Sequence, residues 1–189
     1  MYTSYPDIVL PSGKIKSTDI PQFPPSTYEV ATRLKSIEEQ VTFHIEGFGL
    51  NLDPDFQREH VWTKNQRIAY MEYLLQGGEV AKTLIFSCKK WREGNPEEYV
   101  LVDGKQRLES IRAFIRNELP VFGKFYGDIQ LVGLGPMINW RVVEVNSRED
   151  ALRLYLSLNC GGTPHSQKEL DRVRGLLVKE TSSEPWSTR

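Results

Sequence analysis

The chain has 189 residues, and its charged and hydrophobic fractions, 26% and 39%, are typical of a folded globular protein. This length fits one domain with a substantial core, and the net charge of −1 excludes a global basic field that would draw the protein onto nucleic acid or anionic lipid. Its two cysteines, Cys88 and Cys160, are too few and too far apart for a disulfide framework or a zinc motif. We therefore expect a cytoplasmic protein without a membrane span or a signal sequence.

Hydrophobic periodicity and capping residues predict the order of the secondary structure. Five prolines make residues 1–25 an extended arm, which suits self-association as a swapped homodimer. One domain is expected over residues 26–180, and the end over 181–189 is expected to fray. The predicted elements of the domain are a helix over 26–40, extended structure over 41–52, a helix over 64–76, strands over 83–89 and 98–102, a helix over 105–118, a strand over 140–145 and helices over 148–158 and 167–179.

The passage from a strand into a helix at Asp103 and Gly104 is the most informative segment of the sequence. An apolar run over residues 99–102 ends at this pair, and apolar residues then recur at helical spacing from Leu108. The free N–H groups and the positive dipole of a helix N-terminus attract anions. A glycine at this position lets the backbone approach a bulky phosphate. The turn is therefore a candidate phosphate site.

The side chains of this turn support two interpretations. Lys105 and Arg107 supply positive charge, and the fork of Arg107 can grip a phosphate with two hydrogen bonds. Gln106 can position water or a base, and Asp103 can hold a metal ion or act on a proton. The alternative is a polar turn in which Asp103 caps the helix and Arg107 lies in solvent.

A second polar cluster lies in a predicted loop at Gln57 and Arg58. These two side chains place planar hydrogen-bonding groups shortly before Trp62, and such groups recognise phosphates or bases. The alternative is that Arg58 pairs with Asp55 or Glu59 while the neighbouring aromatic residues belong to the core.

A third loop and a basic hairpin complete the candidates. The loop over residues 159–166 places Gly161 and Gly162 before a helix, which is typical of an anion cradle but also of a flexible connector. Basic residues surround Trp91 at the tip of the predicted hairpin, and they are Lys89, Lys90 and Arg92. This pattern fits contact with a nucleic-acid backbone, and the alternative is a solvated tip.

In order and approximate spacing, the three polar segments resemble the DUF262 family, the N-terminal domain of GmrSD-type modification-dependent restriction enzymes in the ParB/sulfiredoxin-like superfamily. The matching segments are Pro54-x-Phe56-Gln57-Arg58-x-x-Val61-Trp62, Val102-Asp103-Gly104-Lys105-Gln106-Arg107-Leu108 and Asn159-x-Gly161-Gly162-Thr163-Pro164-x-Ser166-x-x-Glu169. The resemblance extends over about residues 40–175. It implies an α+β fold with a ParB/sulfiredoxin-like core, in which helices pack a small mixed sheet and the C-terminal part is helical.

The resemblance also implies a nucleotide site, which in characterised members supports NTP hydrolysis coupled to DNA restriction. Carried onto this chain, it makes Asp103, Arg107 and Arg58 catalytic and places Mg²⁺ at Asp103. The residues implied to bind the NTP are Gly104, Lys105, Gln106, Gln57, Asn159 and Gly162. Lys105 departs from the family, which usually has glutamine there. Because lysine keeps a donor and adds charge, we expect phosphate binding to survive this departure.

We therefore expect an NTP-binding hydrolase that is linked to DNA restriction or phage–host conflict, with DNA and a separate nuclease chain as partners. The three histidines match no nuclease motif, so the chain resembles a nucleotide-handling domain without its nuclease. Two alternatives stay open. One is a non-catalytic ParB-like module that binds nucleotide or DNA, and the other is a metal-dependent nuclease.

Overall fold

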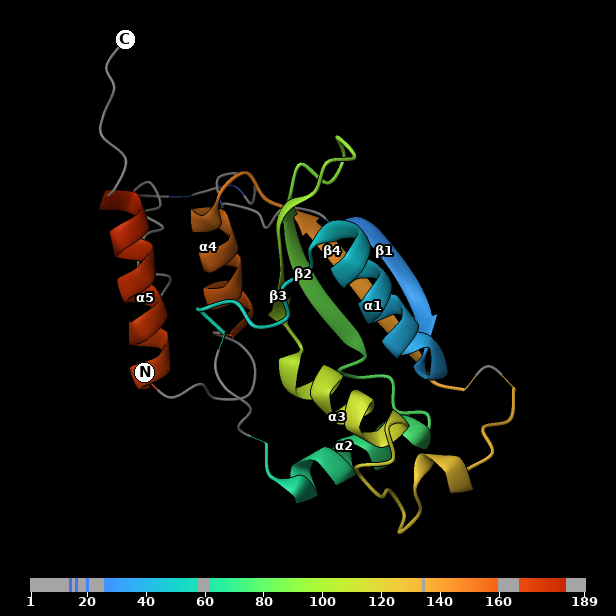
Figure 1. The fold of residues 1–189 in the computed structure, drawn as a ribbon. Helices are drawn as coiled ribbons and strands as arrows, with labels where there is room; N and C mark the ends of the chain where they lie inside the picture. The colour runs from blue at the N-terminus through green and yellow to red at the C-terminus, as the bar shows by residue number, and fades with distance from the viewer. Residues whose placement is uncertain are drawn as a thin grey trace.

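The computed structural model describes residues 14, 16, 20, 26–57, 62–133, 135–159 and 167–182, which form a mixed α+β arrangement (Figure 1). The strands are β1 (Ser26–Arg33), β2 (Thr83–Lys89), β3 (Glu97–Asp103) and β4 (Met137–Glu144). The helices are α1 (Ile37–Phe48), α2 (Lys64–Leu75), α3 (Lys105–Ile115), α4 (Arg148–Asn159) and α5 (Gln167–Ser182), with short 3-10 turns η2 (Leu34–Ser36) and η3 (Tyr126–Asp128). In the part of the chain that is described, no helix is long and apolar enough to cross a membrane.

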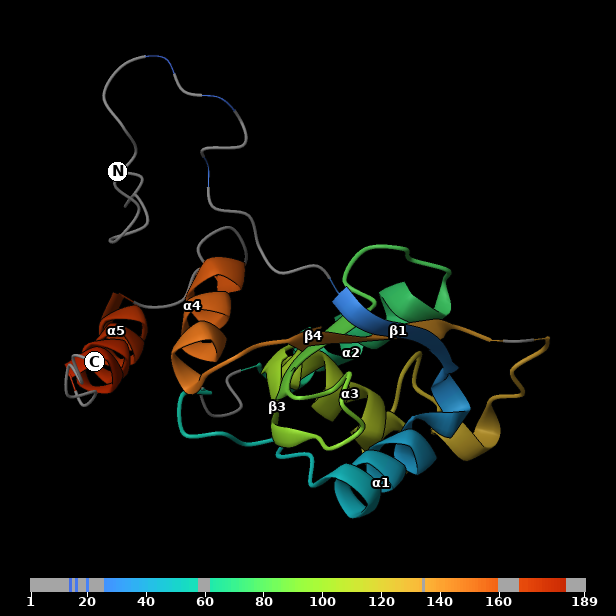
Figure 2. The ribbon, with the colours of Figure 1, turned by 90° about the horizontal axis from the view of Figure 1, so that it is seen from above.

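The four strands form one mixed sheet in the order β1-β4-β2-β3. The central strands β2 and β4 are parallel, whereas each edge strand pairs antiparallel with its neighbour. At the β3 edge, Asn51 makes an isolated bridge to Val100, which brings the segment after α1 alongside the strand. The helices α4 and α5 lie side by side near this edge, away from α1 (Figures 1 and 2). The small mixed sheet and the helical C-terminal part agree with the predicted fold class.

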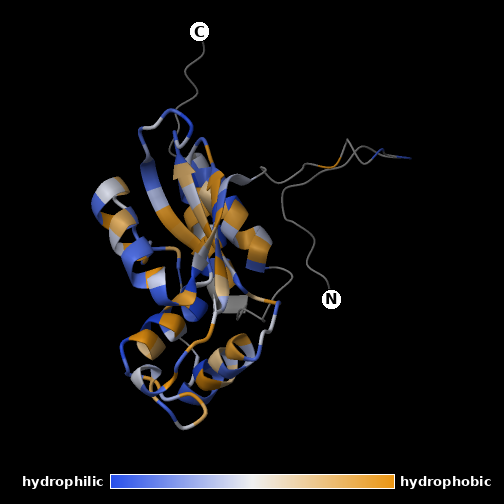
Figure 3. Cartoon of the chain, turned by 90° about the vertical axis from the view of Figure 1, so that its right-hand side faces the viewer, coloured by the Kyte–Doolittle hydropathy of each residue, from blue (hydrophilic) through white to orange (hydrophobic). Residues whose placement is uncertain are grey.

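Successive residues of a strand point to opposite faces of the sheet, and each face carries a buried apolar cluster. Apolar residues colour much of the strands and parts of the helices (Figure 3). One face packs under α1, α2 and α3, and its strand residues are Leu84, Phe86, Cys88, Tyr99, Leu101, Ile138, Trp140 and Val142. The other face packs against α4, and its strand residues are Ile85, Val100, Val102 and Val143. Apolar residues Val173 and Leu177 of α5 join this second core. The second core thus links the C-terminal helices to the strand that ends at Asp103.

The N-terminal part of the domain differs from the sequence-based prediction. Residues 26–33 form the edge strand β1 and not the first half of a helix, and residues 41–48 continue α1 and are not extended. Tyr28 and Val30 pack on the core from β1, so burial at a period of two overrides the local capping signal. Gly49 does not interrupt the helix, because it lies directly after the last helical residue and ends the helix in a left-handed conformation with φ +66°.

A polar network lies inside the main core, centred on the hydroxyl of Tyr99. Trp140 Nε1 donates to this hydroxyl at 2.8 Å, and His44 Nδ1 lies within hydrogen-bond distance of it, at 3.1 Å. The ring of His44 stacks on Trp140 with 4.6 Å between centroids, and its Nε2 lies 2.7 Å from Gln40 Nε2. Burial lowers the pKa of His44 to about 4, so the imidazole is neutral at pH 7.

Candidate functional site

The backbone of the turn after β3 confirms the predicted passage from strand to helix. Gly104 occupies the N-cap position of α3 with φ +102°, and no side chain caps the helix. A Cβ atom at Gly104 would lie 2.7 Å from Leu84 Cδ2, so both the left-handed backbone and the close packing require glycine. The alternative in which Asp103 caps the helix is wrong. By the geometry of an α-helix, the first-turn N–H groups have no partner within the helix, and such groups can bind an anion.

Arg107 braces the turn from the first turn of α3. Its Nη2 donates to Asp103 Oδ2 at 2.5 Å and to Thr83 O at 2.9 Å, which ties the helix to the start of β2. The Arg107 side chain is 19% exposed, so it does not lie in solvent as the alternative required. Its Nε is buried and has no hydrogen-bond partner among the described residues. The guanidinium therefore lies packed against Gly104, next to the partly exposed Asp103 carboxylate.

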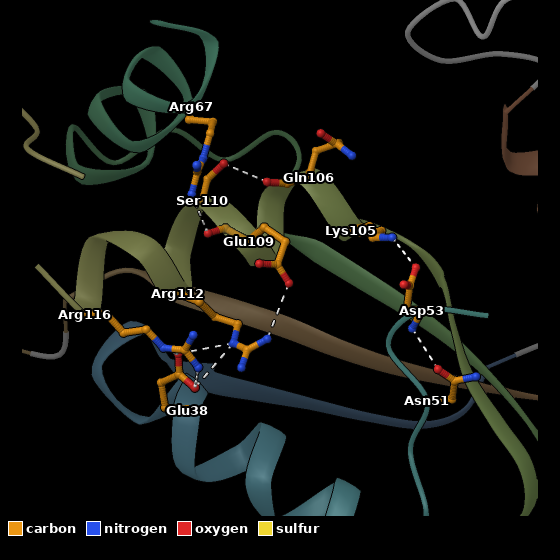
Figure 4. Close-up of polar contacts among 10 residues, drawn as sticks. All are labelled: Glu38, Asn51, Asp53, Arg67, Lys105, Gln106, Glu109, Ser110, Arg112 and Arg116. Atoms are coloured by element: carbon orange, nitrogen blue, oxygen red, sulfur yellow. Dashed lines mark hydrogen bonds and ion pairs between the residues drawn. The ribbon is translucent and has the colours of Figure 1, made fainter. Parts of the chain in front are cut away.

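Lys105 lies at the other side of the turn and forms an ion pair with Asp53 (Figure 4). The two residues point toward each other from α3 and from the segment after α1, and Asp53 N donates to Asn51 Oδ1 at 2.8 Å. The Lys105 side chain is 15% exposed whereas that of Asp53 is 78% exposed. Because one partner is in solvent, this ion pair contributes little to stability and can open.

Gln106 has a role that sequence reasoning missed. Its side chain is buried, and its Oε1 accepts from Trp62 N at 3.0 Å. Trp62 in turn packs against Tyr70 of α2 with 5.4 Å between ring centroids. Gln106 therefore holds the chain that follows the Gln57-Arg58 loop.

Gln57 holds the same loop from the other side. Its Nε2 donates to Leu101 O at 2.9 Å and to Val102 O at 2.7 Å, at the end of β3 that leads into Asp103. The neighbouring Phe56 is buried in the second core, as the core alternative for the aromatic residues required. The second cluster is thus brought to the Asp-Gly turn. Arg58 itself lies outside the described residues.

Two further anchors hold this loop, and neither of them was predicted. Arg148 of α4 donates to both carboxylate oxygens of Asp55, at 2.8 and 2.7 Å. Arg172 of α5 donates to Asp55 O at 2.7 Å and to Phe56 O at 2.8 Å. No local pattern signals these contacts, because each joins residues about a hundred positions apart in the sequence.

The third cluster is not shown to join the turn. Asn159 is the last residue of α4, and its Nδ2 donates to Tyr155 O of the same helix at 2.7 Å. Gly162 lies outside the described residues. This leaves the predicted contribution of the third loop to nucleotide binding as a prediction.

The basic hairpin is balanced by acidic neighbours. Lys89 and Lys90 pair with Glu97 at 3.6 and 2.5 Å, and Arg92 Nε lies 3.3 Å from a carboxylate oxygen of Glu144. The hydrogen bond between Lys90 and Glu97 raises the pKa of the lysine and lowers the pKa of the carboxyl group. The aromatic residue at the tip packs inward on the aromatic core and is not presented to a base. These contacts favour the solvated-tip interpretation over a nucleic-acid contact.

A groove of about 760 Å³ lies beside the loop, between the β3 edge and the C-terminal helices. Its walls include Phe56, Asp55, Arg148 and Glu180, and it contains none of residues 103–107. Among the described residues no group of three or more histidine, cysteine or acidic side chains is placed to hold a metal ion. A metal at the turn would therefore depend on Asp103 together with oxygen atoms of a bound ligand.

A model of a protein family, described as the GmrSD restriction endonuclease N-terminal domain, matches residues 37–152. This range runs from the start of α1 into the first part of α4, and it contains both the Gln57 loop and the Asp103 turn. Comparison with curated proteins and with solved structures gave no match. The family match confirms the resemblance seen in the sequence, while the ParB-like nature of the core stays a prediction.

Proposed function

Because the chain belongs to the GmrSD restriction endonuclease N-terminal domain family, its role is related to restriction, and we propose that the turn at residues 103–107 binds and hydrolyses a nucleoside triphosphate. The observation that carries the proposal is the N-terminus of α3. There a glycine with φ +102° begins the helix, no side chain caps it, and its first turn carries two cationic residues, Lys105 and Arg107. Such a corner attracts a phosphate through backbone donors, the helix dipole and charge together.

The ion pair between Lys105 and Asp53 explains how the site accommodates a ligand. The Asp53 carboxylate is mostly in solvent, so its release from the lysine costs little free energy. A phosphate carries more charge than the carboxylate and also reaches the N–H groups of α3. Lys105 then exchanges Asp53 for the phosphate, with α3 itself unmoved.

Arg107 and Asp103 fit the metal-dependent part of the proposal. Mg²⁺ in nucleotide sites commonly takes one or two carboxylates and fills its shell with phosphate oxygens and water. Asp103 is a single carboxylate, 31% exposed, beside the first turn of α3, and it fits that donor set. When bound there, Mg²⁺ would neutralise charge on the phosphates. Arg107, whose side chain is 19% exposed, adds positive charge beside that carboxylate.

We assign Arg58 to stabilising charge on the transferred phosphoryl group, because Gln57 fixes its loop on the carbonyl groups next to Asp103. Gln106 is assigned a structural role, since its amide already holds Trp62. A restriction role further requires DNA and a nuclease, which we propose as partners of this domain. We also propose that residues 1–25 mediate self-association and that the protein acts in the cytoplasm.

Calorimetric titration of each nucleoside triphosphate with Mg²⁺ tests the binding step. We expect Lys105→Ala to weaken the affinity about tenfold to a hundredfold, because it removes a charge-assisted contact. Lys124→Ala is the matched control, since Lys124 is exposed and lies in the hairpin over residues 121–124, where its backbone pairs with Val121. Equal affinity in the two variants would contradict the assignment of the turn. Binding without any phosphate release would instead favour a non-catalytic nucleotide-binding module.

A further inference from the structure

The short loop over residues 54–57 is held by four separate anchors. Gln57 binds two carbonyl groups of β3, and Phe56 is buried against Tyr155 of α4 with 5.3 Å between ring centroids. The Asp55 carboxylate accepts two hydrogen bonds from Arg148. The fourth anchor is Arg172. It differs from the others because it binds the backbone of the loop, whereas the other three act through side chains of the loop.

Arg172 uses the two arms of its guanidinium on two consecutive peptide groups. Nη1 donates to Asp55 O at 2.7 Å and Nη2 donates to Phe56 O at 2.8 Å. The guanidinium fork is planar and rigid, so binding two successive carbonyls fixes the orientation of both peptide planes. These planes set the direction in which the chain enters Gln57. Arg172 thus controls the backbone of the loop and not only its distance from the sheet.

The position of Arg172 in the chain gives this contact its significance. The family match ends at residue 152, within α4, and α5 begins at Gln167. Arg148 Nε also lies 3.5 Å from Glu180 Oε2 of α5, so the second helix supports the other charged anchor as well. The buried residues Val173 and Leu177 seat α5 in the second core. A helix outside the matched region therefore holds the loop that lies beside the Asp-Gly turn.

Building on the proposed function, we propose that Arg172 is a positioning residue of the nucleotide site. It holds the backbone of residues 54–57 so that Gln57 keeps its hydrogen bonds to the carbonyl groups of Leu101 and Val102, which lead into Asp103. The C-terminal helix pair α4–α5 is then part of the catalytic unit and not a separate appendage. Arg172 acts through the loop and contacts no reacting group.

Amide hydrogen exchange of the full chain tests the structural half of this inference without any nucleotide. The reporter is Gln57 N–H, which donates to Pro54 O at 2.9 Å across the loop. We expect Arg172→Ala to speed its exchange at least tenfold while exchange in β2 is unchanged. Arg174→Ala is the matched control, because Arg174 pairs with Asp171 in its own helix at 3.1 Å. Arg172→Lys, which keeps one donor, is expected to give an intermediate rate. Unchanged exchange in Arg172→Ala overturns the inference.

Steady-state phosphate release tests the functional half. We expect Arg172→Ala to lower kcat at least tenfold with less than a threefold change in KM, because a displaced Gln57 loop disturbs the end of β3 that carries Asp103, and this affects the transferring group more than ground-state binding. Arg174→Ala is expected to retain both values. A faster-exchanging loop with unchanged kcat overturns the positioning role but leaves the proposed function standing. Absence of release by the unmodified chain overturns the proposed function and the catalytic half together, while the exchange result still decides whether Arg172 fixes the loop.

Discussion

Replacing Gly104 with alanine is expected to lower the free energy of unfolding by about 2–4 kcal/mol. Two effects combine at this position. An alanine with φ +102° is strained, and its Cβ would lie 2.7 Å from Leu84 Cδ2. Leu84 is 1% exposed in the core, so its methyl group moves aside only if neighbouring residues repack. Urea unfolding measures the loss.

Gly94→Ala separates the two effects in the same experiment. Gly94 also has a left-handed backbone, with φ +71°, but a Cβ atom added there would have no atom of another residue within 4 Å beyond its chain neighbours. Only the conformational cost applies there, about 1–2 kcal/mol. Equal losses in the two variants would show that the contact with Leu84 does not restrict the turn. Since Gly104 starts α3, the same Gly104→Ala variant is also expected to lose nucleotide binding.

The stability of the protein is expected to fall by about 2 kcal/mol between pH 7 and pH 5, and His44 is the cause. Burial lowers the pKa of folded His44 to about 4, whereas the ordinary pKa of a histidine is 6.5. Below pH 6.5 the unfolded chain therefore binds a proton that the folded chain rejects. The stabilisation is complete above pH 6.5 and is lost progressively as the pH falls toward 4. Most carboxyl groups titrate below this window, which keeps the contribution of the histidine distinct.

A His44→Gln variant provides the control for this pH dependence. Glutamine is neutral across the window, so the slope of stability against pH is expected to flatten even if the variant is less stable throughout. The comparison uses slopes from urea unfolding at pH 7, 6 and 5. A variant with the slope of the unmodified chain would show that other groups, and not His44, account for the loss.

The parts of the fold that depend on local signals could be predicted from the sequence. Thr63 and Gln66 form the capping box that starts α2, and the strand over residues 83–89 has the predicted bounds. The Asp-Gly turn was also predictable, because the apolar run, the glycine and the helical period lie close together in the sequence. Residues 26–48 were not, since Tyr28 and Val30 take the strand conformation only when β4 is beside them.

In the candidate site, too, local features could be predicted and contacts between distant segments could not. The sequence brought the Gln57 loop and the Asp103 turn together only through the family resemblance, and the structure shows the hydrogen bonds that do so. The partners of the turn come from distant segments, with Asp53 on Lys105 and Thr83 on Arg107. An exposed aspartate and a backbone carbonyl carry no sequence signal for such contacts. Arg172 was unpredictable for the same reason, because its partners are backbone oxygens.

Phosphate release from each of the four NTPs with Mg²⁺, with and without duplex DNA, tests the central claim most directly. The unmodified chain is compared with Arg107→Ala and Arg107→Lys. The lysine keeps the positive charge but not the fork of the guanidinium, so it controls for the loss of the hydrogen bonds to Asp103 and Thr83. We predict release that DNA stimulates, and a loss of at least about a hundredfold in Arg107→Ala. No release from any NTP by the unmodified chain, or equal release by the folded Arg107→Ala variant, would contradict a phosphoryl-transfer site at the Asp-Gly turn.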